Sequence, residues 1–382
     1  MKKIFNSIDY IFEKKILTIP VIIFIFSGFV SGIIWRLSIN YAFIADFFTD
    51  TISFAMRFIL TKATYFIPFS LAEMLLFISV PSVLFLLFRF IINIRRSKYY
   101  GKTKTAIFFK GIFRVFAFCG FVLFIFTFTL GVCYGKTSVN EKINFERRLL
   151  GVEDLYSAME ILIAEADKAA DKIQYVYADT GSTKMPYGLK DLNKKLNEAY
   201  IITLEKHDMF KRISSKVKPV ILSVEMSKMH ITGVYSFFTG EANVNIDFPD
   251  YNLPYVAAHE MAHLMGVGRE DEANFTAFLV CLYSDDDYIR YSGLVNMIEY
   301  IGNALYREDS EKYYEVTRDM HAIIKSEMSA FSRFFDKYRN APSSKIASAA
   351  NNTYLKAQGQ EQGIKSYGFV VDLAVVYLLD IY

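Results

Sequence analysis

The residues best suited to do chemistry in this 382-residue chain are two histidines and a glutamate, spaced His259-Glu260-x-x-His263. Histidines four positions apart lie on one face of a helix, one turn from each other, so both imidazoles can bind one tetrahedral metal ion. Glu260 projects slightly aside, where it can take a proton from a metal-activated water without binding the metal itself. The pattern predicts a Zn²⁺ site that hydrolyses peptide bonds, with Glu260 as the catalytic general base.

The residues around this motif predict a buried helix. Pro254 suits the first turn of a helix, and most of the residues that follow it, apart from the motif, are apolar or small. A buried helix retains imidazole and carboxylate side chains only where a partner satisfies them. We therefore expect the motif to face a metal ion.

A catalytic zinc site also needs a third protein ligand. Gly266 and Gly268 allow the chain to reverse, and the next predicted helix opens with several acids. The positive end of the helix dipole favours acids there as well, so not every acid needs to be a ligand. Glu270 and Asn274 are i, i+4 neighbours, so a metal ligand and a second residue that orients it can share a face. Glu272 is the alternative third ligand.

Composition divides the chain into a transmembrane region, residues 1–135, and a catalytic domain, residues 136–382. The first part is rich in Phe, Ile, Leu and Val, whereas the second mixes charged, polar and apolar residues as soluble domains do. Three apolar segments, at about residues 16–34, 71–92 and 112–134, are long enough to cross a bilayer as helices. The chain is therefore predicted to bind the lipid bilayer as a multi-pass protein.

Basic residues predict the direction in which the spans cross. The first 15 residues carry four lysines, and the loop between the second and third spans carries six basic residues and no acid. The positive-inside rule places both regions in the cytoplasm, so three crossings make the catalytic domain extracytoplasmic at the cell membrane. The net charge of +3 is too small to indicate a nucleic-acid partner. These basic residues are Lys2, Lys3, Lys14, Lys15, Arg95, Arg96, Lys98, Lys102, Lys104 and Lys110.

Residues 43–62, between the first two spans, predict an amphipathic helix. Asp46, Asp50, Arg57 and Lys62 are set among Phe, Ile and Met. Such a helix lies in the plane of the membrane interface with its apolar side toward the lipid, and the alternative is a short additional span, which would disturb the charge bias.

The catalytic domain is predicted to have an α+β fold, mainly helical with a small β-sheet. Hydrophobic periodicity and β-branched composition distinguish its helices from its strands, and Thr239-Gly240 predicts the turn of a hairpin between the last two strands. The final run is too short to span a membrane and predicts a buried core helix. The predicted helices are 149–172, 189–213 and those from 255 to the C-terminus, and the predicted strands are 219–224, 232–238 and 242–246.

The motif resembles that of the gluzincin zinc peptidases. His259-Glu260-x-x-His263 is followed by Glu270-x-x-Ala273-Asn274, which is similar to the gluzincin pattern that supplies the third ligand. The resemblance implies that Glu270 is this ligand. The whole chain also resembles an uncharacterised family of bacterial membrane proteins, a domain of unknown function, in which N-terminal spans precede this motif. That resemblance includes residues 239–245, 354–356 and 366–368.

The gluzincin resemblance implies further site residues. In gluzincin-like enzymes an edge strand before the active-site helix binds the substrate backbone, and Ala242, Asn243, Val244 and Asn245 occupy that place. An oxyanion-stabilising residue is also expected, for which His321, Tyr354 and Tyr367 are candidates. His207 and His230 are interpreted as ordinary surface or core residues.

These features together predict a membrane-anchored zinc endopeptidase with a zincin-like domain behind three transmembrane helices. Its expected substrates are membrane-proximal or envelope proteins and peptides. The alternatives are a zinc-binding membrane sensor or transducer, and a pseudoenzyme with a structural metal and no general proteolytic activity.

Overall fold

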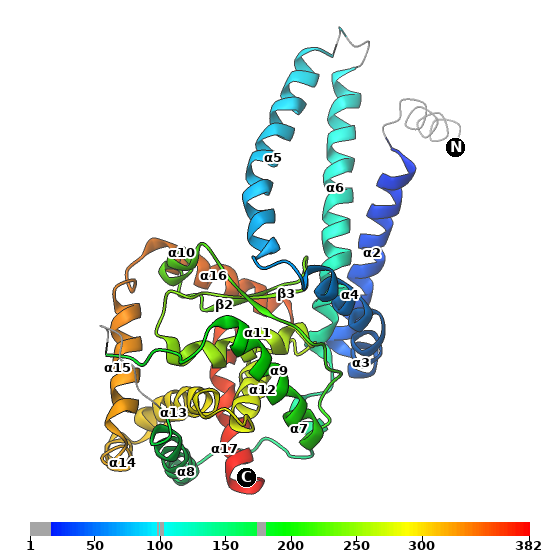
Figure 1. The fold of residues 1–382 in the computed structure, drawn as a ribbon. Helices are drawn as coiled ribbons and strands as arrows, with labels where there is room; N and C mark the ends of the chain where they lie inside the picture. Colours follow the sequence, from blue (N-terminus) through cyan, green and yellow to red (C-terminus); the bar gives the residue numbers. More distant parts are fainter. Residues whose placement is uncertain (1–16, 98, 100–102, 174–180) are drawn as a thin grey trace.

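The computed structural model describes residues 17–97, 99, 103–173 and 181–382 (Figure 1). The four N-terminal lysines, Lys98 and Lys102, which contribute to the predicted orientation, lie outside these residues, as does the side chain of Tyr367.

Three helices are long and apolar enough to cross a membrane: α2 (Ile19–Asn40), α5 (Leu71–Arg95) and α6 (Lys104–Thr129). They confirm that the chain is a membrane protein with N-terminal spans. The third helix begins earlier than predicted because Thr103 caps it, accepting a hydrogen bond from the Ala106 N–H at 3.2 Å. It also ends earlier, since the chain tightens at Gly131–Gly135 into a 3₁₀-helix, η2.

The three spans are packed unequally. Helices α2 and α6 touch closely, and a Cβ on Gly28 would lie 2.4 Å from the Cα of Gly120. Small residues of this kind let membrane helices approach. Helix α5 stands apart from this pair over most of its length, and its residues 74–89 are exposed on every side (Figure 1).

The predicted amphipathic segment is helical and lies at the base of the spans (Figure 1). It consists of α3 (Ala42–Phe48), a π-helical turn η1 (Thr49–Ser53) and α4 (Phe54–Thr64). One side of α4 exposes Phe58 and Ile59, whereas Arg57 on the other side is 1% exposed. The segment therefore presents apolar side chains outward and an arginine toward the rest of the protein.

The remaining chain forms an α+β domain in which helices enclose a three-stranded sheet. Helices α11, α12 and α13 form its centre, and α17 is a buried core helix as predicted. Apolar residues of α6 and η2, including Phe126 and Tyr134, belong to the same hydrophobic core as α11 and α12. The remaining helical bounds are α7 (Val139–Lys142), α8 (Val152–Ala170), α9 (Leu189–Lys206), α10 (Ser223–Lys228), η3 (Asp250–Asn252), α11 (Leu253–Leu264), α12 (Glu270–Leu282), α13 (Asp287–Glu308), α14 (Ser310–Val316), α15 (Ala322–Asp336), α16 (Pro342–Ala357), η4 (Gly363–Phe369) and α17 (Val370–Asp380).

The sheet has the strand order β1-β3-β2. Strands β2 (Gly233–Ser236) and β3 (Glu241–Val244) form the predicted antiparallel hairpin, and β1 (Val217–Pro219) pairs with β3 in parallel. The predicted strand at 219–224 is wrong beyond Pro219. The N–H groups of Ile221 and Leu222 donate to the carboxylate of Glu73 instead of to a neighbouring strand, and the chain turns into α10.

The predicted substrate edge at Ala242, Asn243, Val244 and Asn245 is also wrong. Strand β3 has a neighbour on each side, so its backbone groups are already paired, and Asn245 lies beyond the strand. Among the described strands the edge next to the motif belongs to β2.

Candidate metal centre

Helix α11 carries the motif, and all 12 of its residues are buried. Pro254 lies in its first turn, where no backbone N–H is needed. The N–H of Tyr255 donates to the hydroxyl of Ser292 at 3.1 Å and so satisfies one of the free groups at the helix start. On this helix the Nε2 atoms of His259 and His263 lie 3.0 Å apart.

The turn after α11 directs the chain back toward these histidines. Gly266 has φ +94°, a left-handed conformation that favours glycine, and a Cβ there would lie 2.6 Å from a guanidinium nitrogen of Arg57. A Cβ on Gly268 would lie 2.7 Å from the carbonyl carbon of Cys133. The predicted reversal is therefore present, and the turn is seated against α4 and η2.

Glu270, the first residue of α12, completes a cluster with the two histidines. Its Oε2 lies 3.4 Å from Nε2 of His259 and 3.3 Å from Nε2 of His263. Within the described residues, these three form a group whose potential ligand atoms all lie within 4.8 Å of one another. Two separate helices therefore bring one carboxylate and two imidazoles to a common point.

The spacing of this cluster fits a tetrahedral ion. Ligand bonds of about 2.0–2.1 Å place the ligand atoms of such an ion roughly 3.3–3.4 Å apart. The carboxylate-to-histidine distances have this value, and they exceed the usual range of about 2.7–3.2 Å for hydrogen bonds. The distance between the imidazole nitrogens is slightly shorter. The donor set, two imidazoles and one carboxylate, is one that zinc accepts in catalytic sites.

Further hydrogen bonds and neighbouring charges orient the side chains of the cluster. Nδ1 of His263 lies 2.7 Å from the carbonyl oxygen of Val267, so the ring donates there and its Nε2 faces the cluster. Burial disfavours a charge on His263, but the carboxylates of Glu270 and Glu260 outweigh burial and raise the pKa of His263 to about 9. Burial likewise opposes ionisation of Glu270, yet the two histidines hold its pKa well below the ordinary value. The carboxylates of the cluster thus favour a positive charge beside them.

Glu260 lies beside the cluster and beneath strand β2. A Cβ on Gly233 would lie 2.5 Å from its Oε1, and the backbone N–H of Tyr235 donates to its carboxylate. Burial is the main cause that raises the pKa of Glu260 to about 7. Its Oε2 has no hydrogen-bond partner among the described residues. A buried carboxylate with this pKa can both accept and release a proton near neutrality.

Glu272, the alternative third ligand, points away from the cluster. Its Oε1 accepts hydrogen bonds from the Val139 N–H at 3.2 Å and from the Arg269 guanidinium at 2.6 Å. Asn274 lies one turn after Glu270, and its side chain hydrogen-bonds to the phenol of Tyr300. The structure thus brings Glu270 to the histidines and leaves Glu272 in an ion pair.

Of the oxyanion candidates whose side chains are described, only Tyr354 lies near the cluster. Its hydroxyl is 3.0 Å from that of Tyr134. Burial raises the pKa of Tyr354, and the charge on Glu270 adds to this effect. His321 instead caps α15, where its Nδ1 accepts the Ile323 N–H at 3.2 Å. His207 and His230 also lie outside the cluster of metal-ligand atoms.

Three residues near the site escaped the sequence analysis. Tyr235 points from β2 to the same side as Gly233, and its buried hydroxyl has no partner in the described part of the chain. The period-two pattern of 232–238 could have shown that these two residues share a face. Arg57 and Cys133 support the turn between the ligands, and Nη1 of Arg57 donates to Sγ of Cys133 at 3.1 Å. The helical spacing of Arg57 from Asp50, Ser53 and Thr61, which puts a charged residue on a polar face of 43–62, was the available signal.

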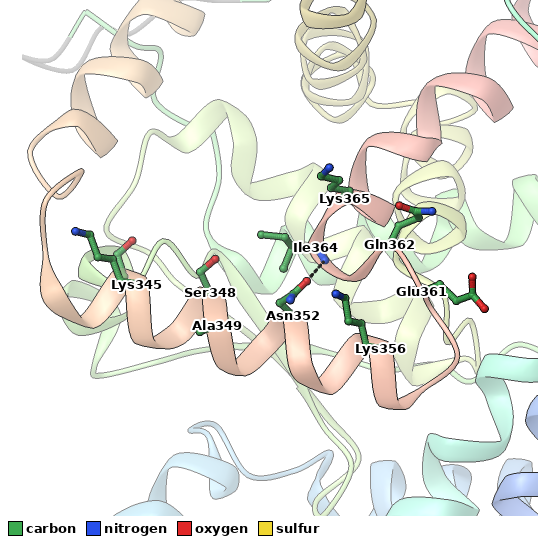
Figure 2. A pocket seen from close by; sticks show the side chains of 10 residues that line it. Lys345, Ser348, Ala349, Asn352, Lys356, Glu361, Gln362, Ile364 and Lys365 are labelled. Carbon is green, nitrogen blue, oxygen red and sulfur yellow. Dashed lines mark hydrogen bonds between the residues drawn. The ribbon is translucent and has the colours of Figure 1, made fainter.

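A separate surface groove of about 680 Å³ lies between α16 and η4 (Figure 2). Lys345, Lys356 and Lys365 line it, and the Asn352 side chain accepts the Ile364 N–H across it at 3.2 Å. His259, His263 and Glu270 are not among its lining residues, so this groove is distinct from the candidate metal centre.

A family model described as a protein of unknown function, DUF3810, matches residues 48–375. The chain belongs to the DUF3810 family. The match extends from the last residue of α3 through α5 and α6 into α17, and it confirms the predicted membership of an uncharacterised family. Neither the comparison with curated proteins nor the comparison with solved structures found a match for this DUF3810 protein.

Proposed function

We propose that this DUF3810 protein is a membrane-anchored zinc-dependent endopeptidase that cleaves membrane-proximal or envelope proteins, with its catalytic domain on the extracytoplasmic side. One observation carries the proposal. Nε2 of His259, Nε2 of His263 and Oε2 of Glu270 meet at the spacing of a tetrahedral ion, and Glu260 is buried beside them without joining the cluster. A structural zinc site commonly has four protein ligands, whereas a catalytic site has three.

Each residue of the site would have a distinct role in the reaction. His259, His263 and Glu270 would hold the ion, which when bound supplies Lewis acidity that activates water and polarises a peptide carbonyl. Glu260 would accept a proton from the attacking water at its free Oε2 and return it to the leaving amine. Tyr354 is the candidate to donate a hydrogen bond to the developing oxyanion.

Strand β2 is the candidate for substrate binding, in place of the predicted β3. It is the edge strand above Glu260, and its Val234 side chain is 47% exposed. A peptide that added to this edge would pair through its backbone, so recognition would tolerate many side chains. The glycine at position 233 lets this strand approach the general base.

The test uses the full chain purified in lipid nanodiscs, with zinc content measured by mass spectrometry and cleavage measured on a peptide library. Glu260→Gln is expected to retain zinc and to lose about 10²- to 10⁴-fold in kcat, the usual contribution of a general base. Glu327→Gln is the matched control, because Glu327 is also a buried glutamate with a pKa of about 7 but lies in α15. This control should cleave normally.

A metal-binding sensor is the second candidate, favoured by the seating of the ligand turn on Arg57 and Cys133 from the membrane side. In such a protein the metal would bias contacts with the spans instead of cutting a substrate. Stoichiometric zinc in both proteins with no cleavage of any peptide would reject the peptidase in favour of the sensor. Absence of zinc from the wild type would reject both.

A further inference from the structure

Five exposed apolar side chains gather where the catalytic domain meets the spans, and we call them the apolar ledge. Two come from the segment before α5, one from the first turn of α10, one from the chain two residues before α10, and one from the turn between β2 and β3. The ledge consists of Phe66 (86% exposed), Phe69 (46%), Ile221 (73%), Val224 (42%) and Phe238 (41%).

Hydrogen bonds place Ile221 level with the beginning of α5. Glu73, in the first turn of this span, accepts the N–H of Ile221 at 2.9 Å and that of Leu222 at 2.7 Å. In return Glu241 of β3 accepts the N–H groups of Leu71 and Ala72 at 3.2 and 2.9 Å. A side chain of β3 thus accepts the free N–H groups at the start of α5, and a side chain of α5 accepts the free N–H groups that follow β1. These bonds hold the start of α5 beside the sheet.

Aromatic packing places Phe238 level with the end of α6. The neighbouring ring of Phe237 packs edge-to-face on Phe126, in the last turn of α6, with ring centroids 5.3 Å apart. The hydroxyl of Thr61 in α4 donates to the carbonyl of Gly240 at 3.0 Å. The β2–β3 turn is therefore attached both to a span and to the interfacial helix.

These attachments put the ledge at the depth where the spans leave the membrane, on the side of the domain that faces them (Figure 1). Phe66 and Phe69 lead directly into α5, so the exposed apolar surface continues that of the spans without interruption. Exposed apolar patches that continue a membrane-spanning surface are stabilised by lipid. We infer that the ledge rests in the membrane surface and that the occupant of this face is lipid.

The same geometry identifies the class of substrate, a step that rests on the proposed function. Tyr235, whose N–H meets Glu260, is three residues before Phe238 in the chain. Three residues span at most about 10 Å even when fully extended, and Phe238 lies in the turn after β2, so a peptide paired with β2 would be cut within about that distance of the bilayer surface. The substrate is then the segment of a membrane-anchored protein that directly adjoins the lipid.

The lipid contact is tested without reference to activity. A bimane label is attached to single cysteines at Phe66, Ile221 or Phe238 in a Cys119→Ala background, because the other two cysteines are buried. Nanodiscs of phosphatidylcholine then include a doxyl-labelled phosphatidylcholine as quencher. A label at Tyr314, 62% exposed on α14 at the opposite side of the domain, is the control (Figure 1).

Lipid quenching several-fold stronger at the three ledge positions than at Tyr314 is expected. Quenching equal to that of the control would overturn the ledge. Labels shielded from both the lipid quencher and aqueous iodide would also overturn it, because a protein partner would then cover the face.

The substrate class is tested with one peptide sequence in three forms: free, joined to a transmembrane helix by a short spacer, or joined by a long flexible spacer. The short-spacer form should be cut about tenfold faster, as expected for a raised effective concentration, and within a few residues of the membrane. Ile221→Asp should slow this cleavage and leave the free peptide unaffected, whereas Tyr314→Asp should change neither.

Equal rates for the free and short-spacer peptides would overturn the substrate class while the proposed peptidase stands. If no form is cut, the proposed function fails and the substrate class with it, whereas the quenching result still decides the ledge. The two failures are therefore distinguishable.

Discussion

Two buried clusters of charged side chains differ in how many of their polar side-chain atoms have a hydrogen-bond partner. The first anchors α5 to the sheet through Glu73, Lys218 and Glu241. Each carboxylate oxygen in this anchor has at least one donor, and the ammonium of Lys218 donates to Glu241 and, at 2.9 Å, to the carbonyl of Thr64. The anchor is complete without any further group.

The candidate metal cluster of His259, Glu260, His263 and Glu270 differs, because some of its polar atoms have no hydrogen-bond partner. Nδ1 of His259 and Oε2 of Glu260 and of Glu270 have no hydrogen-bond partner within the described chain, although all three residues are at most 9% exposed. Nε2 of both histidines and Oε2 of Glu270 lie 3.0–3.4 Å from one another, so a proton or a metal cation is needed among them to offset the repulsion between their lone pairs. The difference teaches that a structural cluster provides hydrogen-bond partners for all of its own polar atoms. A cluster that leaves converging polar atoms without partners can instead bind a cation.

The sharpest test of this difference compares two glutamates of α12. Glu270→Gln is expected to weaken zinc binding by more than the roughly 10- to 100-fold that outer-shell partners contribute, because it removes a ligand. Glu272→Gln should retain zinc and lower the free energy of unfolding by about 1–3 kcal/mol, because it weakens a buried ion pair. Competition with a fluorescent zinc chelator measures the affinities. Equal zinc affinities for the two variants would refute the assignment.

The histidine pair could be predicted from sequence because helical spacing alone places both rings on one face. The choice between Glu270 and Glu272 could not, since it depends on the angle at which α12 leaves the turn. That angle is set by Gly266 and Gly268 packing on Arg57 and Cys133, residues far away in the chain. The resemblance to gluzincins indicated Glu270 where spacing left both acids open.

In the fold, too, some features follow from the local sequence and others from contacts between residues that are distant in the chain. The spans and the β2–β3 hairpin follow from composition and local pattern, and both were predicted. The place of β3 at the centre of the sheet requires β1, a strand of three residues that ends in a proline and gives almost no periodic signal. The anchor depends on pairs such as Glu73 with Ile221, which are distant in sequence and have no pattern.

Breaking the anchor should destabilise the protein without emptying the metal cluster. Lys218→Met leaves Glu241 buried without its counter-ion, so the free energy of unfolding should fall by about 3–5 kcal/mol. Thermal unfolding in nanodiscs measures the loss, and zinc per folded molecule should stay unchanged. The control Lys195→Met breaks a more exposed pair with Asp286 and should change stability by less than about 1 kcal/mol. Loss of zinc from folded Lys218→Met would show that the two clusters are coupled.

Glu327 is an intermediate case between the two clusters and should impose a pH dependence. Its Oε1 accepts the Thr183 N–H at 3.0 Å, but its Oε2 has no partner among the described residues, and burial raises the pKa of Glu327 to about 7. The folded state therefore binds a proton that the unfolded state releases near pH 4.5. Stability should fall as pH rises from about 4.5 through 7, by on the order of 3 kcal/mol for this group.

Glu327→Gln keeps the bond from Thr183 and has no charge to bury. It should flatten the fall and make the variant more stable than the wild type at pH 8. Unfolding temperatures between pH 5 and 8 provide the measurement, and a slope identical to that of the wild type would contradict the assignment. The exposed Glu361→Gln is the control and should leave the slope unchanged.

A small change in stability is expected from Gly233→Ala, which adds a methyl group against Glu260, beside the candidate metal cluster. The added methyl group would lie 2.5 Å from Oε1 of Glu260, so strand or carboxylate must shift, at about 1–3 kcal/mol. Because the ligands themselves are untouched, zinc should remain while cleavage falls. Gly368→Ala, where no atom lies within 4 Å of the new Cβ, is the control and should leave both unchanged. Normal cleavage by Gly233→Ala would mean that catalysis does not require Glu260 to keep its position beneath β2. The cluster of His259, His263 and Glu270 would then still identify a metal site, but Glu260 would no longer be identified as its general base.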